Sequence, residues 1–301
     1  MTDHLMSQYH HQLPLNRLAV LCGCVRTSYY RRRQRQSPQQ RHPGNDSKAL
    51  ISELHRICAL ETGYGYRRVT CALRQKGRKA NHKRILRLMR QENLLWHPRR
   101  RFHMPTTDSR HDLKIYPNRA KTMVVKRLNQ LWVSDITYLH CGRDRSVYLA
   151  AVLDAKSRYC VGWALQPYLD TRLTREALER ALKARGPCRV HHSDRGMQYA
   201  SNEYTTVLHK NKVRISMSRP GNPYDNAVAE SLFKTIKTEE IYLQDYNSLH
   251  QARQSIKNYI EKRYNQRRLH SSLGYLSPKA YEAAYYSHRR STLSSSPRVS
   301  P

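Results

Sequence analysis

The chain has 301 residues, of which 55 are lysine or arginine and 22 are aspartate or glutamate, so that its formal net charge is +33. This charge predicts a polyanionic partner, either nucleic acid or a membrane surface, and the lack of a long apolar run excludes a membrane-spanning helix. The seven cysteines are scattered and the first residues show no secretory signal, which predicts a cytoplasmic protein with reduced thiols.

Residues 1–45 are predicted to form a basic helical segment followed by a linker. Within this segment, residues 13–33 combine an apolar helical run, a break at Gly23 and several arginines. The pattern is compatible with half of a helix-turn-helix unit, and equally with a basic amphipathic helix that has no specific target. Both interpretations stay open at this point.

Residues 46–97 are predicted to form three short helices, the shape of a helix-turn-helix module. Gly63 marks the end of the first helix, and Asn81 caps the third. Between residues 63 and 105 there are thirteen lysines and arginines and one acidic residue. A solvated basic face is the alternative, but this local excess favours contact with nucleic acid through Arg84 and Arg87 of the third helix. Residues 98–125 show no periodicity and are predicted to be a basic linker.

The pattern changes in residues 126–285, where strands and helices alternate. The expected strands are 131–140, 147–153, 159–165, 188–194 and 212–218, and the expected helices lie near 174–184, near 202–210 and after residue 226. This order, β-β-β-α-β-α-β-α, predicts an α/β protein with a mixed sheet covered by helices. A capping box at Ser248 and Gln251 and the pair Ser277-Pro278 start two further helices. Residues 286–301 are expected to be disordered.

Three carboxylates stand out in this basic chain. Asp135 lies within a predicted strand, where an aspartate indicates an exposed edge, a hydrogen-bonded buried carboxylate or a metal ligand. Asp194 ends a predicted strand, and the alternative to a metal ligand there is a residue that only forms a turn. Glu230 lies on a predicted helix, and its alternative role is in an ion pair on the helix surface. Reactions at phosphodiesters use divalent cations, and these cations prefer oxygen ligands such as carboxylates. Because DNA repels carboxylates, a group of them in a DNA-binding protein is explained by a bound cation.

Other polar residues receive simpler structural interpretations. Asp154 is expected to shape a hairpin turn, and Asp225 or Asn226 to cap the helix that carries Glu230. His191 and His192 are expected to be a strand-end pair that packs or faces solvent, because their spacing does not fit a zinc site.

Three motifs in this order resemble a known group of proteins. They are LWVSDITYL around Asp135, HHSDRGMQYAS around Asp194 and RPGNPYDNAVAESLFKTIKTE around Glu230, and 35 residues lie between Asp194 and Glu230. The chain resembles insertion-sequence transposases of the Asp-Asp-Glu group, with a catalytic core like that of retroviral integrases, and in particular the product of the second reading frame in two-frame elements. The resemblance continues through YNQRRLHSSLGYLSPKAYE and YGYRRVTCALRQKG, and so covers most of the chain.

The resemblance implies a ribonuclease-H-like fold and a metal-dependent DNA cleavage and strand-transfer activity. Asp135, Asp194 and Glu230 would be the catalytic residues and the ligands of two Mg²⁺ or Mn²⁺ ions. Lys237, with Lys234, would contact DNA near the cut phosphate. Hydrolysis at an element end would expose a 3′-hydroxyl that attacks a second phosphodiester.

The resemblance also implies partners and a location: double-stranded DNA of the element ends and target, a homo-oligomer on that DNA, an upstream-frame product, no membrane, and the bacterial cytoplasm near the nucleoid. The sequence lacks the zinc-binding module of retroviral integrases and a leucine-heptad coiled coil, and Arg195 stands where relatives often have an uncharged residue. The alternative functions are a catalytically silent DNA-binding regulator derived from a transposase and a ribonuclease-H-type nuclease.

Overall fold

The computed structural model describes residues 8–9, 17, 20–21, 45–96, 112–142, 145–219 and 226–294. The chain divides into two compact units, Met1–Ser52 and Glu53–Pro301, and each is described by itself. The segment 13–33, with its two open interpretations, lies outside the described residues apart from three isolated positions. No helix in the described part of the chain is both long and apolar enough to cross a membrane.

Three helices precede the sheet: α4 (Asn45–Leu60), α5 (Tyr66–Gln75) and α6 (His82–Gln91). Residues 53–96, which include the end of α4 and all of α5 and α6, are called the helical module below. As predicted, the side chain of Asn81 caps α6 by accepting a hydrogen bond from the Lys83 backbone N at 2.9 Å. The apolar stripes of the module are buried at Leu54, Ile57, Val69, Leu73, Ile85 and Met89.

A five-stranded mixed sheet follows, as the sequence predicted. Its strands are β1 (Leu131–Cys141), β2 (Arg145–Asp154), β3 (Cys160–Gln166), β4 (Val190–Ser193) and β5 (Arg214–Met217). Their spatial order is β3-β2-β1-β4-β5, with antiparallel pairing among β1, β2 and β3 and parallel pairing of β4 with β1 and with β5. The longest strand, β1, therefore lies at the centre.

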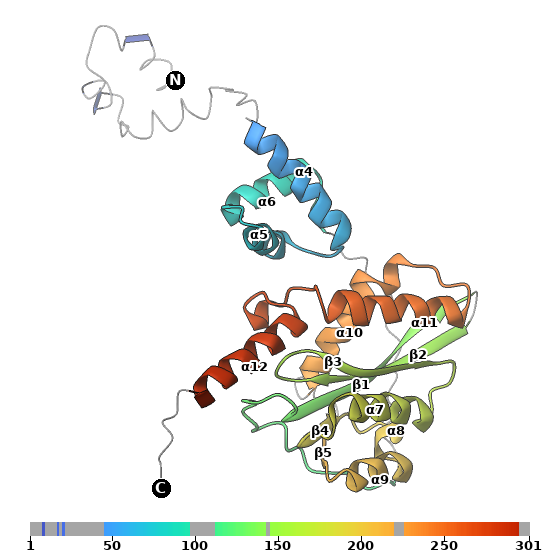
Figure 1. The fold of residues 1–301 in the computed structure, drawn as a ribbon. Helices are drawn as coiled ribbons and strands as arrows, with labels where there is room; N and C mark the ends of the chain where they lie inside the picture. The colour runs from blue at the N-terminus through green and yellow to red at the C-terminus, as the bar shows by residue number, and fades with distance from the viewer. Residues whose placement is uncertain are drawn as a thin grey trace, which may run out of the picture. The chain divides into compact units, whose positions relative to one another are not determined.

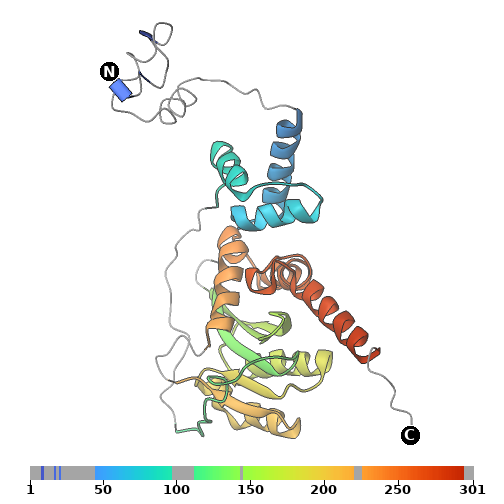
Figure 2. The same ribbon diagram turned by 90° about the vertical axis from the view of Figure 1, so that its left-hand side faces the viewer.

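Helices cover both faces of the sheet, as Figures 1 and 2 show. Side chains alternate along β1, so Trp132 and Ile136 pack into one core with α7 (Thr171–Arg185) and α9 (Asn202–Lys210). The residues of the opposite parity, such as Val133, pack into a second core with α10 (Ala227–Glu239) and α11 (Leu249–Lys257). A short helix, α8 (Met197–Ala200), follows the residue Asp194 and was not predicted from the sequence.

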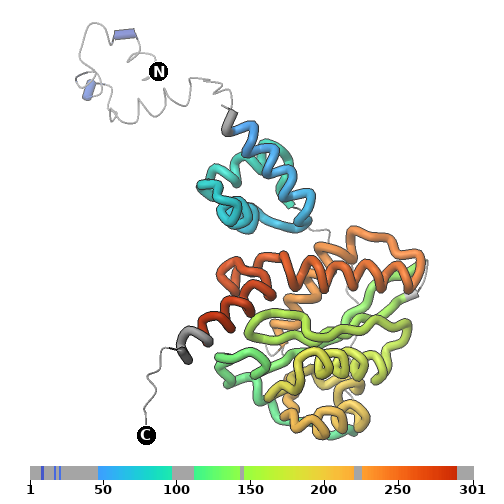
Figure 3. The backbone as a smooth tube through the Cα atoms, viewed as in Figure 1, coloured from blue at the N-terminus to red at the C-terminus, as the bar shows by residue number. Residues whose placement is uncertain are grey.

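The C-terminal part is more helical than the sequence indicated, and its path can be followed in Figure 3. A short turn of 3-10 helix, η2 (Ile241–Leu243), follows α10. α11 continues directly into a π-helix, η3 (Asn258–Tyr264), and a second 3-10 turn, η4 (Ser271–Leu273), precedes α12 (Pro278–Ser294). Of the tail expected to be disordered, residues 286–294 belong to α12, and residues 295–301 lie outside the described residues. No proline or glycine interrupts the chain until Pro297.

Part of the predicted linker 98–125 is fixed to the sheet. The backbone N–H groups of Arg119 and Ala120 donate hydrogen bonds to Ser216 Oγ at 2.8 and 3.3 Å. The expected role of Asp154 in a turn is confirmed, because its carboxylate accepts hydrogen bonds from the backbone N–H groups of Asn129, Lys156 and Ser157. Asp225, the other expected cap of α10, lies outside the described residues.

Candidate active site

Asp135 lies in the middle of β1, between β2 and β4, so the exposed-edge interpretation is wrong. Because side chains alternate along a strand, Asp135 shares the sheet face of Val133 and Leu139, which is the face covered by α10. Its Oδ1 atom accepts a hydrogen bond from the Ile136 backbone N at 2.8 Å. The strand thus presents a partly buried carboxylate toward α10.

Asp194 is the first residue after β4, which runs parallel to β1. Val133 is paired with His192, so two residues further along both strands Asp194 reaches the level of Asp135. Adjacent strands are about 4.8 Å apart, which places the two aspartates side by side. Asp194 also shapes a turn, since its Oδ1 atom accepts a hydrogen bond from the Gly196 backbone N at 2.9 Å. A Cβ atom at residue 196 would lie 3.1 Å from that oxygen, so glycine leaves space beside the carboxylate.

Glu230 occupies the first turn of α10 and is exposed. The opposite face of the helix is fixed in the core by Leu232, Phe233 and Ile236, whereas Val228, which the sequence also placed on the buried side, is only partly buried. Asn226 precedes the helix, but it does not cap it through its side chain. Its Nδ2 atom instead donates a hydrogen bond to the backbone oxygen of Ser134 at 3.2 Å, and so ties the start of α10 to β1.

Electrostatics link the three carboxylates. The pKa of Asp135 is raised to about 8, chiefly by burial and then by the charge of Asp194, with a smaller contribution from Glu230. The Ile136 backbone N–H and the ammonium of Lys237 act in the opposite direction. Asp194 and Glu230 therefore both lie close enough for their charge to act on Asp135.

The donor set suits a hard divalent cation, because carboxylate oxygens are its preferred ligands and a cation would relieve their repulsion. The side chains do not form a closed cage, however. Among the residues that the structure describes, no three histidine, cysteine, aspartate or glutamate side chains converge closely enough to hold a metal ion.

The basic residues predicted to contact DNA fall in two places. Lys237 lies two turns after Glu230, partly buried, with Nζ 4.7 Å from the centre of the Tyr138 ring. Burial lowers the pKa of Lys237, and the nearby Asp135 opposes this shift. Lys234 is exposed on the same helix. Arg84, half-buried, and Arg87, exposed, belong to α6 in the helical module and not to this site.

Behind the carboxylates lie buried polar residues, among them the histidine pair that the sequence placed at the end of a strand. His191 is fully buried, and its Nε2 atom lies 2.8 Å from Ser134 Oγ and 3.0 Å from Tyr204 Oη. Burial lowers its pKa to about 3, so the ring is neutral at physiological pH. The sequence predicted that His191 and His192 form a strand-end pair that packs or faces solvent, and the packed alternative is confirmed because both rings are buried.

Tyr199 of α8 is also fully buried near the two aspartates. Its hydroxyl has no hydrogen-bond partner among the residues that the structure describes. Burial, then Tyr204, Asp135 and Asp194, raise its pKa well above the usual value, so the phenol stays neutral. Neutral groups therefore line the site on the side of α8.

Family comparisons divide the chain into recognisable parts. An integrase core domain is matched by residues 125–223 and again by residues 211–278, and an HTH-like domain by residues 46–102. Among solved structures, a simian T-cell lymphotropic virus intasome in complex with PP2A regulatory subunit B56 gamma is 15% identical, with a TM-score of 0.44, and the match covers 82% of this chain and 76% of that chain. The catalytic core domain of BIV integrase is 16% identical, with a TM-score of 0.39 over 53% of this chain and 99% of that chain.

Curated relatives match over longer stretches. The insertion element IS600 uncharacterized 31 kDa protein of Shigella sonnei is 34% identical over 267 residues, which cover 88% of this chain and 97% of that protein. The transposase for insertion sequence element IS904 of Lactococcus lactis is 34% identical, covering 73% of this chain and 87% of that protein. Transposase InsF for insertion sequence IS3A of Escherichia coli is 37% identical, and the match covers 73% of this chain and 76% of that protein.

Proposed function

Because the chain belongs to the insertion-sequence transposases with an integrase core domain, and so acts in DNA transposition, we propose that Asp135, Asp194 and Glu230 are its catalytic residues. The observation that carries the proposal is that parallel pairing of β4 with β1 places Asp194 beside Asp135, while Glu230, on the helix that covers this face of the sheet, is close enough for its charge to act on Asp135. The raised pKa of Asp135 supports it, since Asp194 and Glu230 both contribute to the shift.

In the proposed reaction a water oxygen attacks a phosphorus atom at the element end, and the 3′-oxygen leaves with a proton. The freed 3′-hydroxyl then attacks a phosphodiester of the target DNA and displaces a target 3′-oxygen. Two Mg²⁺ or Mn²⁺ ions held by the three carboxylates would supply activation of the attacking hydroxyl and stabilisation of the leaving oxygen. Lys237, whose ammonium lies over Tyr138 on the side of Asp135, would orient the phosphate by its charge.

A duplex oligonucleotide that carries the element end tests this function. With the protein and Mg²⁺, the duplex is expected to be nicked so that a 3′-hydroxyl is exposed at the element end, and then to be joined to a second duplex. A catalytically silent regulator would bind the same duplex and leave it intact. A ribonuclease-H-type nuclease would instead cut an RNA–DNA hybrid in preference.

Metal binding should depend on pH through Asp135. Its pKa of about 8 in the folded, metal-free protein lies far above that of an unfolded chain, which is near ~4. The folded state therefore keeps a proton that the unfolded state loses, and stability falls as the pH rises between these two values. Since Mg²⁺ binds the ionised carboxylate, its binding at pH 7 is expected to release about one proton, and almost none at pH 9.

Calorimetric titration with Mg²⁺ in two buffers of different ionisation enthalpy measures this release. The Asp135→Asn variant lacks both this proton and one of the proposed ligands, so it is expected to show neither Mg²⁺ binding nor proton release. Equal proton release by the wild-type protein at pH 7 and pH 9 would contradict the assignment.

The helical module is proposed to bind DNA through Arg84 and Arg87 of α6. Replacing both with glutamine is expected to reduce the slope of log affinity against log salt concentration by about 0.9 for each phosphate that the variant no longer neutralises. Affinity for duplex DNA measured over a salt series checks this. Replacing Arg172, which is exposed, and Arg175, which is half-buried, removes the same charge from α7 and should leave the slope closer to wild type. An unchanged slope in the α6 variant would show that this helix does not contact DNA.

The proposal extends to the partners and the layout of the chain. The DNA partner is double-stranded, at the element ends and the target, and a homo-oligomer assembles on it together with an upstream-frame product. The proposed division is a basic segment at 1–45, a DNA-binding module at 46–97, a linker at 98–125 and a catalytic core at 126–285. The proposed location is the bacterial cytoplasm, associated with the nucleoid.

A further inference from the structure

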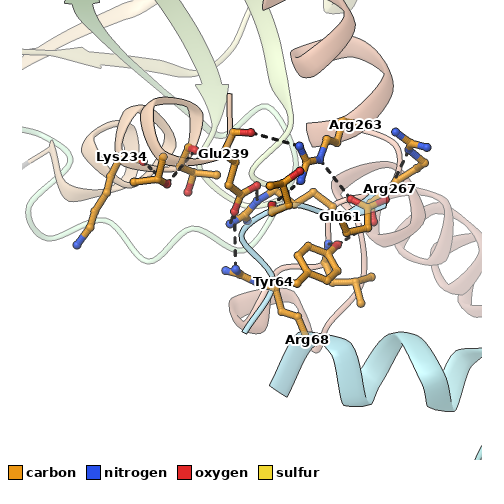
Figure 4. A network of polar contacts seen from close by, with 12 residues as sticks. Glu61, Tyr64, Arg68, Lys234, Glu239, Arg263 and Arg267 are labelled. Atoms are coloured by element: carbon orange, nitrogen blue, oxygen red, sulfur yellow. Dashed lines mark hydrogen bonds and ion pairs between the residues drawn. The ribbon is translucent and has the colours of Figure 1, made fainter. Parts of the chain in front are cut away.

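The other end of α10 carries a second, buried carboxylate. Glu239 is only 3% exposed and lies nine residues after Glu230. Its oxygens accept hydrogen bonds from Arg268 Nε at 2.8 Å, Arg268 Nη2 at 2.7 Å and Tyr259 Oη at 2.8 Å. Arg68 of the helical module adds an ion pair at 3.8 Å. These four residues, Glu239, Arg268, Tyr259 and Arg68, are called the Glu239 cluster, and Figure 4 shows Arg68 directed toward Glu239.

The helical module touches this carboxylate with its backbone as well. Gly63, in the turn between α4 and α5, has a φ of +86°, and a Cβ atom there would lie 2.6 Å from Glu239 Cγ. Only glycine combines that backbone conformation with such a close approach. The turn therefore packs directly against the side chain of Glu239.

Further bonds hold the same turn. Arg263 of the π-helix η3 donates to Glu61 Oε2 at 3.3 Å and to the Glu239 backbone oxygen at 3.3 Å, and also bonds the Thr62 backbone oxygen. Tyr64 Oη accepts a hydrogen bond from the Leu269 backbone N at 2.7 Å. Figure 4 shows Glu61 and Arg263 meeting beside Glu239. Residues 61–68 and residues 259–269 therefore contact each other beside the last turn of α10.

Because a short α-helix is stiff, a displacement of one end also displaces the other end. Nine residues of α-helix span about 14 Å, and such a short helix moves as a rigid body. Charge-assisted bonds to a buried carboxylate have demanding geometry, so they add to the core packing of α10 in fixing its rotation and its axial position. Glu230 is exposed in the first turn, and its location therefore depends on where the helix is held.

We propose that Glu239 is a positioning residue for Glu230, and that the helical module sets the position of α10 through Gly63 and Arg68. The inference rests on the proposed catalytic role of Glu230. A module displaced from the Glu239 cluster would leave the sheet aspartates in place and move the third carboxylate away from them.

Two substitutions on the module side test this without removing Glu239. Gly63→Ala crowds the Glu239 side chain, and Arg68→Met removes one of its ion pairs. Gly77→Ala is matched to the first, because Gly77 has a φ of +80° and a Cβ atom there would have no heavy atom within 4 Å. Arg67→Met is matched to the second, because the exposed Arg67 bonds Tyr66 instead.

The measurement is the single-turnover cleavage rate over a range of DNA concentrations, with unfolding followed in parallel. Gly63→Ala is expected to lower the rate at saturating DNA by about a hundredfold, with the half-saturating DNA concentration unchanged. Arg68→Met should lower it less, and both control variants should cleave at the wild-type rate. Mn²⁺ binding to the free protein should weaken in Gly63→Ala and not in Gly77→Ala.

Each outcome decides a separate point. If Gly63→Ala and Arg68→Met cleave as fast as their controls, the positioning role is overturned. If Gly63→Ala does not fold, the cleavage rates of Arg68→Met and Arg67→Met test the positioning role by themselves, and equal rates overturn it. If Glu230→Gln cleaves normally, the proposed function fails whatever the module variants do, so that the two failures are distinguishable.

Discussion

Asp135→Asn, Asp194→Asn and Glu230→Gln are each expected to lower Mg²⁺-dependent DNA cleavage by about a thousandfold or more. Each substitution replaces a charged oxygen ligand with an amide of the same shape, so that the local packing is kept and the capacity to hold a divalent cation is lost. The effect should be similar at the three positions because the carboxylates act as one unit. The measurement is the rate at which a labelled element-end duplex is nicked.

DNA binding by the same three variants is expected to stay near the wild-type level, since removing a negative charge does not weaken attraction to a polyanion. Glu179→Gln on α7 is a suitable control, because Glu179 is exposed and paired with Arg175 outside the site. Full cleavage by the Asp135→Asn protein would mean that the site has been assigned to the wrong residues.

Arg268→Met is expected to lower the free energy of unfolding by about 3–5 kcal/mol, because it leaves the carboxylate of Glu239 buried without its main partner. Both side chains are 4% exposed, and the guanidinium makes two hydrogen bonds to the carboxylate. Removing one partner of a buried ion pair destabilises the folded state by more than the intact pair stabilises it, because the remaining charge stays buried away from water without a partner. Urea denaturation of the wild-type protein and of the Arg268→Met variant measures the difference in the free energy of unfolding.

Two further variants distinguish the burial of an unpaired carboxylate from the simple removal of an arginine charge. The double variant Glu239→Leu/Arg268→Met removes both charges of the buried pair and should recover part of the lost stability, although Arg68 then loses its ion pair with Glu239. Arg175→Met breaks an exposed ion pair between neighbouring turns of α7, and should cost less than about 1 kcal/mol. An equal loss in Arg175→Met and Arg268→Met would contradict the account of the buried pair.

The parts of the structure that depend on local pattern were predictable from the sequence. Alternation marked β1, and the order of the elements predicted the mixed sheet, which the structure confirms. The position of Asp194 beside Asp135 follows from parallel pairing of two strands, once that pairing is known. The resemblance to integrase-type transposases is confirmed by the matching domains and relatives.

What the sequence did not predict depends on contacts between distant segments. Asn226 was one of two residues expected to cap α10, but its side chain bonds a backbone oxygen of β1 instead, which no local pattern reveals. Glu239 ended the motif around Glu230 without any role, because its partners Arg268 and Arg68 lie on other segments of the chain. The π-helix after α11 was likewise expected to be ordinary α-helix, since its apolar spacing alone does not distinguish the two.

The bonds around Glu239 also impose an order in time on the synthesis of the protein. Glu61 bonds Arg263, 202 residues later, and Tyr64 bonds Leu269, 205 residues later. Chain segments fold as they leave the ribosome, but these contacts cannot form until nearly the whole polypeptide has been translated. A nascent chain, or a product that terminates before residue 263, therefore carries Asp135, Asp194 and Glu230 without the contacts made by Arg263 and Arg268. If the proposed roles of Glu230 and Glu239 hold, such an incomplete copy is expected to cut DNA more slowly than the full chain.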